Sequence, residues 1–156
     1  MSLIEIRRIR VREGALDLEV AIPVSVLHVT QDQADRILGL LPNLARHVCV
    51  NGAGDGSFGD ELVGTELAHL LEHLIIELQG KAARGGEFTG HTSWLEELET
   101  TVPQGYALMR TTVTFANDFV ALGAMNCALE IIDWASGFDE ADAPDIEGMI
   151  AFLAAM

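Results

Sequence analysis

The chain has little of what several common protein classes need. Its two cysteines in 156 residues are too few for a disulfide framework. Its 9 lysine and arginine residues are outnumbered by 24 aspartate and glutamate residues, which gives a formal net charge of −15. A protein that binds the phosphate backbone needs a basic surface, so we expect no nucleic-acid partner. Either the acidic surface attracts a cationic ligand, or its charge only keeps the protein soluble.

Long apolar runs are also absent. No stretch approaches the roughly 18 apolar residues that span a bilayer. The N-terminus, MSLIEIRRIR, lacks a signal-peptide core with a cleavage site. We therefore expect a cytoplasmic protein with reduced thiols and no membrane partner. The length and a hydrophobic content of 49% predict one domain with its own core.

Two catalytic motifs are missing as well. The glycine-rich segment 50–60, VNGAGDGSFGD, has neither the Lys-Ser/Thr ending of a P-loop nor the G-x-G-x-x-G spacing. We interpret it as an adaptable surface loop at the rim of a cleft. No serine lies in the G-x-S-x-G pattern of a nucleophile elbow. These absences leave no sign of nucleotide binding or serine-based acyl transfer.

Strand and helix patterns interleave along the chain. The expected elements are strands at 4–11 and 15–22 joined at Gly14, a short helix from the capping box Thr30/Gln33 to Pro42, a long helix at 65–83 ended by Gly85–Gly86, a strand at 106–115, a helix at 117–134 and a last helix capped by Asp145. Residues 85–105 are expected to be a mobile connection with a short helical piece near 94–99. This order predicts an α/β (α+β) sandwich with helices on a small, mainly antiparallel sheet.

The sequence HLLEH, residues 69–73, lies inside the most apolar helix. His69 and His73 are four residues apart, so their rings lie one turn apart and can hold one zinc ion. Glu72 lies between them and can act as a general base. These residues share one arc of about 140° with Glu66 and Glu77. H-x-x-E-H is the inverted zinc-hydrolase pattern, although an amphipathic helix with a solvated polar face would look the same.

Other residues are weaker candidates. His47 and Cys49, in RHVCV, could reach a metal or could simply pack. His91 could contact substrate or simply be exposed, whereas we expect His28 to be structural. A third metal ligand is required besides the two histidines.

Several separated motifs together resemble the N-terminal domain of cyanophycin synthetase. They are LPNLARHVCVNGAGDGSF and GTELAHLLEHLIIELQ, with their order and spacing kept. The resemblance covers residues 1–135, and 136–156 are expected to form an acidic linker and a helix packed on the same domain. The chain departs from the family at Ala68, where the family has glycine, and at 88–93, where FTGHTS replaces GFGRTR.

The resemblance implies a site and a substrate. Cyanophycin has a poly-aspartate backbone with arginine on its side chains, and the family's N-terminal module binds this polymer or cuts it at a zinc site. By position, the resemblance makes His69 and His73 ligands, Glu72 the base and Glu77 a candidate for the remaining acid. From the residues alone, Asp118 and Glu130 on the later helix are either part of a solvated face or candidates for the third ligand. His47 and His91 are candidate substrate contacts.

Two functions are therefore expected. The first is a zinc-dependent hydrolase of an amide or peptide bond, acting on an arginine-rich peptide or polymer. The second is a non-catalytic module with a degenerate metal site that binds a cationic polymer or a partner protein. The sequence leaves the oligomeric state open, including a homo-oligomer.

Overall fold

The computed structural model describes residues 2–49, 56–95, 104–137 and 142–156. Strands β1 (Glu5–Arg12) and β2 (Ala15–Pro23) form a hairpin. Gly14 makes its turn with a φ of 74°, a conformation that glycine adopts without steric cost. The sheet has the order β1-β2-β4-β3, and every neighbouring pair is antiparallel. The expected α/β class is confirmed.

The sheet has one covered face and one open face. On β2, Leu16, Leu18 and Val20 are fully buried, while Asp17 and Glu19 between them point the other way and stay partly exposed. This strict alternation is the pattern of a strand with one face on the core. Helices α3 (Leu67–Ala82) and α4 (Asp118–Ala135) pack on the covered face.

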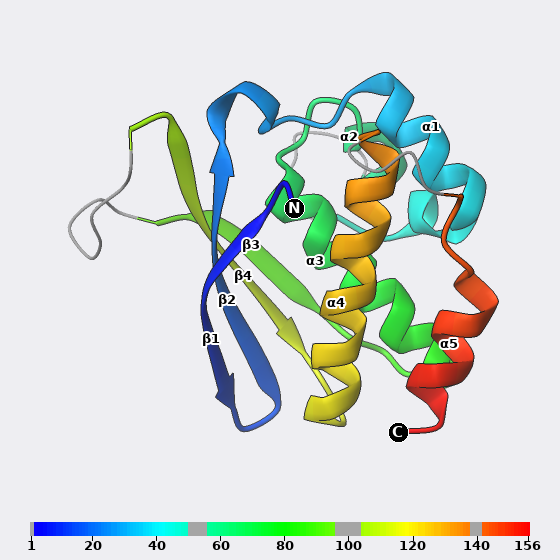
Figure 1. Cartoon of the computed structure of the whole chain (residues 1–156). Helices are drawn as coiled ribbons and strands as arrows, with labels where there is room; N and C mark the ends of the chain where they lie inside the picture. The colour runs from blue at the N-terminus through cyan, green and yellow to red at the C-terminus, as the bar shows by residue number, and fades with distance from the viewer. Residues whose placement is uncertain (1, 50–55, 96–103, 138–141) are drawn as a thin grey trace.

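The remaining helices lie outside this central pair. In Figure 1, α1 (Gln31–Leu40) and α5 (Ile146–Ala154) flank α3 and α4 on the side away from the sheet. Three short helical segments complete the described part of the chain, namely η1 (Val24–Val26), η2 (Pro42–Arg46) and α2 (Phe58–Glu61). No described helix has both the length and the apolar composition to cross a bilayer.

Side-chain caps fix the helix starts where the sequence predicts them. Thr30 and Gln33 form the expected capping box at α1. Asn117 caps α4, and Asp145 caps α5 through the backbone amide of Gly148. Satisfying these orphan amides typically contributes about 1 kcal/mol for each helix.

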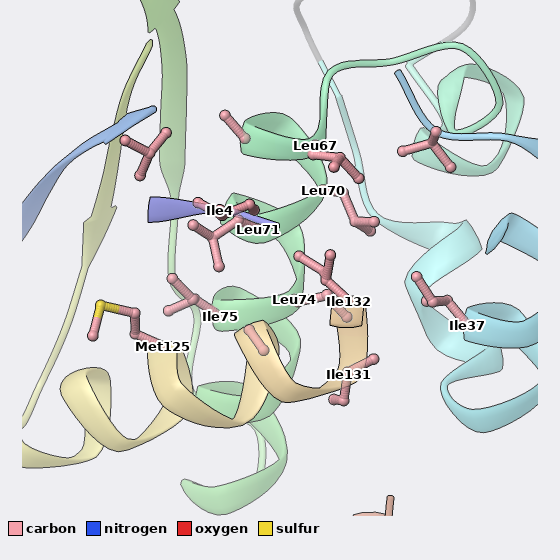
Figure 2. Packing of buried hydrophobic residues seen from close by; sticks show 14 of the residues in the cluster. Ile4, Ile37, Leu67, Leu70, Leu71, Leu74, Ile75, Met125, Ile131 and Ile132 are labelled. Atoms are coloured by element: carbon pink, nitrogen blue, oxygen red, sulfur yellow. The ribbon is translucent and has the colours of Figure 1, made fainter. Parts of the chain in front are cut away.

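The core lies between the sheet and the helices. Figure 2 shows the apolar side of α3 meeting α4 and the N-terminal segment. The labelled side chains are Leu67, Leu70, Leu71, Leu74 and Ile75 from α3, Met125, Ile131 and Ile132 from α4, Ile4, and Ile37 from α1. This packing surrounds α3 and makes it the most buried helix of the described chain.

One segment differs from the expectation. Residues 90–94 were expected to lie in a mobile connection, but they form strand β3 (Gly90–Trp94), which pairs with β4 (Tyr106–Thr114). The helical piece expected near 94–99 begins in this strand, and its residues 96–99 lie outside the described part. Because GHTSW is short and has no alternation of apolar residues, its strand state depends on pairing with β4.

Candidate metal and hydrolase site

The polar stripe of α3 lies inside the protein. His69, Glu72 and His73 are only 5%, 3% and 3% exposed, and Glu77 is 9% exposed. The amphipathic alternative, a polar face that simply meets solvent, does not describe this helix. Buried polar groups need partners, so the surroundings of these four side chains indicate what the site can do.

Three donor atoms meet beside α3. The Nε2 atoms of His69 and His73 are 3.2 Å apart, and the Sγ atom of Cys49 lies 3.4 Å from His69 Nε2. The donor atoms of Cys49, His69 and His73 all lie within 4.8 Å of one another, and all three residues are buried. This cluster, called the donor cluster below, could hold a metal ion.

The segment after η2 carries Cys49 to this position. An isolated antiparallel bridge joins Val48 to Ser57, and the Phe58 amide donates to the His47 carbonyl at 2.8 Å. The Ser57 hydroxyl also donates to the Ala45 carbonyl at 2.7 Å. These contacts hold the segment against the N-terminal half of α3, so that a cysteine 20 residues before His69 reaches its ring.

The outer nitrogen of each histidine has its own partner. His73 Nδ1 lies 3.1 Å from Nδ1 of His47, whose Nε2 lies 3.3 Å from Oε1 of Glu77. His69 Nδ1 lies 2.8 Å from the Thr65 hydroxyl. If each Nδ1 donates outward, both Nε2 lone pairs face Cys49. Partners of this kind orient and tune histidine ligands at metal sites.

Phe58 fixes the plane of both rings. Its ring stacks on His73 at 3.8 Å between centroids with an interplanar angle of 17°, and it meets His69 edge-on at 5.1 Å. Phe58 is fully buried, so its rotation is restricted by packing. The two imidazoles are therefore held between a phenyl ring and their hydrogen-bond partners.

Glu72 lies against β3. The Thr92 hydroxyl donates to Glu72 Oε1 at 2.7 Å, and the other carboxylate oxygen lies 3.6 Å from His73 Nε2. Gly90 allows this close approach, because a Cβ there would come within 2.7 Å of Glu72 Cγ and 2.9 Å of the Thr112 carbonyl. The strand that the sequence did not predict thus positions the expected general base.

Burial shifts the protonation equilibria in a useful direction. It raises the pKa of Glu72 to about 7, partly offset by the Thr92 hydrogen bond. It lowers the pKa of His73 to about 3, with the neighbouring histidines adding to the effect, and it also lowers the pKa of His69. Both imidazoles are therefore neutral near pH 7, as metal ligands must be, and Glu72 is poised to exchange a proton.

Two cavities flank the donor cluster. One, of about 470 Å³, borders His69 and contains the carboxylates of Glu61 and Glu66. The other, of about 540 Å³, borders His73 and contains Glu77 and Glu87. No lysine or arginine lines either cavity among the described residues. The site therefore has acidic space on both sides of its donor atoms.

The structure places the remaining predicted residues as follows. Glu77 contacts His47, not the donor cluster, and its Oε2 atom is buried without a hydrogen-bond partner among the described residues. Asp118 and Glu130 belong to α4 and do not join the donor cluster. His91 is exposed on β3 and does not join the donor cluster.

Cys49 takes the place that the sequence left open for a third donor. Its spacing from His69 does not specify a contact, so only the order His-x-Cys pointed to it. Phe58, Thr65 and Thr92 were not singled out at all. The stacking of Phe58 could have been suspected only from the resemblance, in which this phenylalanine is part of the shared pattern.

One comparison with known protein families decides the relationship. The model of the cyanophycin synthase-like N-terminal domain matches residues 16–135. The chain belongs to this family. No curated protein matches the chain significantly. In this cyanophycin synthase-like domain the matched region contains the donor cluster, Glu72 and both strands that border α3, whereas α5 lies outside it.

Proposed function

We propose that this cyanophycin synthase-like domain is a zinc-dependent hydrolase that cuts an amide or peptide bond in a cationic, arginine-rich polymer such as cyanophycin. The observation that carries the proposal is the meeting of three buried donor atoms beside a buried carboxylate. The proposal is supported by residues suited to each task, namely metal binding, orientation of the ligands and proton transfer, and by cavities that could admit a substrate.

The donor set fits zinc. Thiolate and imidazole are preferred zinc ligands, and three protein ligands plus an open position are typical of catalytic sites. At the usual zinc–ligand lengths, a tetrahedral ion separates two nitrogen ligands by about 3.3 Å and a sulfur from a nitrogen by about 3.6 Å. The separations of 3.2 Å between the two histidines and 3.4 Å between Cys49 and His69 are close to these values, and the donor atoms of Cys49 and His73 lie within 4.8 Å of each other. His69, His73 and Cys49 would hold the ion.

The surrounding residues then have separate tasks. When bound, zinc supplies a Lewis acid that polarises a carbonyl oxygen and acidifies a nearby water molecule. Glu72 accepts a proton from the attacking water and returns it to the leaving amine. Thr92 holds one Glu72 oxygen, which directs the other toward His73 and the donor cluster. The Glu77–His47 pair keeps the His73 ring turned inward.

The acidic cavities support a cationic substrate. Glu61 and Glu66 line the cavity on one side of the donor cluster, and Glu77 and Glu87 line the cavity on the other side. The guanidinium groups of a polymer that occupies both cavities would therefore meet carboxylates on either side of the cluster. Trp94, 55% exposed at the edge of the first cavity, offers a ring face to a cation. Contacts inside the cavities are screened less by salt than contacts on the open surface.

The decisive experiment measures hydrolysis by zinc-loaded protein. Glu72→Gln is expected to keep the fold and the metal but to lower the rate by about 10²–10⁴, because glutamine cannot accept the proton. His69→Ala is expected to lose both metal and activity. Unchanged turnover in Glu72→Gln would place the base elsewhere. Wild-type protein that takes up no transition metal would refute the enzymatic proposal.

Substrate class needs its own test. Arginine-bearing, lysine-bearing and neutral polymers of equal length are compared at low and physiological salt. We expect a preference for the arginine-bearing polymer that weakens with salt but persists, because part of it comes from the cavities. Equal binding of the neutral polymer at both salts would rule out a cyanophycin-like substrate.

A second candidate function is a non-catalytic module that binds the polymer around a structural metal. The observation in its favour is Glu61, whose Oε2 accepts from the Cys49 thiol at 2.8 Å and could close the fourth ligand position. Structural zinc sites have all four positions filled by protein. Glu61→Gln separates the two candidates by the size of its effect. A loss of zinc as complete as that expected for His69→Ala would make Glu61 a ligand, whereas a roughly 10–100-fold loss of affinity would make it a hydrogen-bond partner of Cys49.

A further inference from the structure

Strand β1 has a free edge. It is the first strand in the order β1-β2-β4-β3, so it pairs with β2 on one side and with no described strand on the other (Figure 1). A free edge presents unpaired N–H and C=O groups that can receive another strand. Among the described strands β3 forms the opposite edge, and it packs against α3 at the site above.

The strand β1 exposes apolar side chains on one face and arginines on the other. Ile9 and Val11 oppose the buried Leu18 and Leu16 of β2, so they point to the helix side of the sheet. They are nevertheless 44% and 47% exposed, because the helices do not extend over this edge. The residues between and beside them are arginines, which point to the open face. The strand therefore alternates exposed apolar and cationic side chains.

This edge concentrates positive charge in an acidic protein. Four of the nine cationic residues lie on β1, namely Arg7, Arg8, Arg10 and Arg12. Arg12 pairs with Asp17 at 2.6 Å, whereas neither Arg8 nor Arg10 has an ion-pair partner among the described residues. The strand β1 is therefore positively charged although the protein has a net charge of −15.

The paired edge of β1 shows which strand the free edge would accept. Across the hairpin, Arg8 and Arg10 oppose Glu19 and Asp17, while Ile9 and Val11 oppose leucines. The partner strand β2 thus alternates acidic and apolar residues. We infer that the free edge of β1 binds an extended segment of a partner protein in which acidic and apolar residues alternate, by addition of a strand to the sheet.

The other occupants are less well matched. Antiparallel pairing of β1 with a second copy would set arginine against arginine, which is destabilising at directly opposed positions. A nucleic acid would meet Arg8 and Arg10 but would be repelled by the rest of the surface. An acidic–apolar strand would pair with the backbone edge, place carboxylates beside Arg8 and Arg10, and place apolar side chains beside Ile9 and Val11.

A peptide test addresses the proposal directly. The probe is a fluorescein-labelled heptapeptide, Glu-Val-Glu-Val-Glu-Val-Glu, added to the full chain at low salt. Binding is measured by anisotropy, and protection of the β1 amides by hydrogen exchange. The controls are the same peptide with lysine or glutamine for glutamate, and one with alternate backbone nitrogens methylated. We expect binding and β1 protection with the glutamate peptide alone.

Paired variants locate the contact. Arg8→Glu/Arg10→Glu is expected to weaken binding about tenfold or more, because attraction becomes repulsion. Arg46→Glu/Arg84→Glu makes the same change in net charge away from β1. It should bind the peptide almost as well as wild type, with only the small loss of affinity that the more negative net charge causes. Arg8→Glu/Arg10→Glu places like charges opposite Glu19 and Asp17, which could destabilise the hairpin. Arg8→Gln/Arg10→Gln avoids this repulsion and should show a smaller loss of peptide affinity.

Several results would overturn the inference. If the methylated peptide binds as well as the parent, no strand is added. If both double-glutamate variants bind equally, the contact lies elsewhere. If no peptide binds, the arginines only prevent self-pairing of the edge. None of these outcomes depends on hydrolysis or metal content.

Discussion

Two central helices of similar length are buried in different ways. α3 has 16 residues and α4 has 18, and they pack against each other on the same face of the sheet. Every buried residue of α4 is apolar. Each helix buries seven apolar residues, but α3 also buries His69, Glu72, His73, Glu77 and Gln79.

The difference separates what folds the domain from what the site requires. α4 shows that a helix in this layer can be buried with apolar residues alone. The polar residues of α3 carry a desolvation cost, visible in the lowered histidine pKa values and the raised Glu72 pKa. Strongly shifted pKa values cluster at functional sites, so we expect the functional residues on α3 and a supporting role for α4.

The two cysteines allow the sharpest test of this comparison. Cys49→Ala removes a donor atom beside α3, whereas Cys127→Ala changes a half-buried thiol on α4. We expect Cys49→Ala to lose stoichiometric zinc and Cys127→Ala to keep it, as measured by elemental analysis of protein purified without chelator. Equal zinc content in the two variants would remove Cys49 from the ligand set and return the third position to an acid such as Glu77.

A core substitution on α4 should lower the stability of the protein without removing its zinc. Ile132 is 1% exposed and packs against the helical core in Figure 2. Ile132→Ala should lower the free energy of unfolding by about 2–5 kcal/mol through lost burial and a cavity. At temperatures where it remains folded, it should bind zinc like wild type. A loss of zinc without a loss of stability would show that α4 shapes the site directly.

The same contrast explains what the sequence could and could not predict. The length, position and apolar face of α3 follow from local pattern, and so do the spacing of His69 and His73 and the caps at Thr30 and Asp145. These features depend on residues a few positions apart, and the structure has the elements where they were expected.

The remaining parts of the site depend on distant contacts. Cys49 meets His69 because η2 and the Val48–Ser57 bridge fold the chain back, and no spacing rule specifies that distance. β3 exists because β4 pairs with it, although its own sequence is short and has no alternation of apolar residues. Thr92 reaches Glu72 only through that pairing, so the support of the base could not be predicted before the strand was known.

The cost of burying Glu72 should be measurable in metal-free protein. Its folded pKa of about 7 lies above the ordinary 4.5, so the unfolded chain ionises first as pH rises. The stability contribution of this group is therefore fully present below pH 4.5 and is lost between about pH 4.5 and 7. Glu72→Gln has no titrating group at this position. Above pH 7 its free energy of unfolding should therefore be higher than that of wild type by about 3 kcal/mol.

Denaturant unfolding of chelated wild type and Glu72→Gln, from pH 4 to pH 8, tests this expectation. The stability contributed by the histidines is lost in the opposite direction, as pH falls below their ordinary pKa of 6.5. They are present in both proteins, so the difference contains only their interaction with the Glu72 charge. A difference that stays constant with pH would mean that folding does not shift the pKa of Glu72.

The smallest effect is expected at Glu77, which supports a ligand without being one. Its Oε1 atom lies 3.3 Å from His47, which in turn contacts His73 at 3.1 Å. Glu77→Gln keeps an oxygen acceptor for His47 but removes the negative charge that makes the histidine pair a better donor. Such partners typically contribute 10–100-fold to metal affinity. We expect a loss in that range by competition with a zinc chelator, and none for Glu87→Gln, which changes an exposed carboxylate of the same cavity. Complete loss of zinc in Glu77→Gln, as large as in Cys49→Ala, would make Glu77 a direct ligand, and the orphaned Oε2 atom would then be the one that binds.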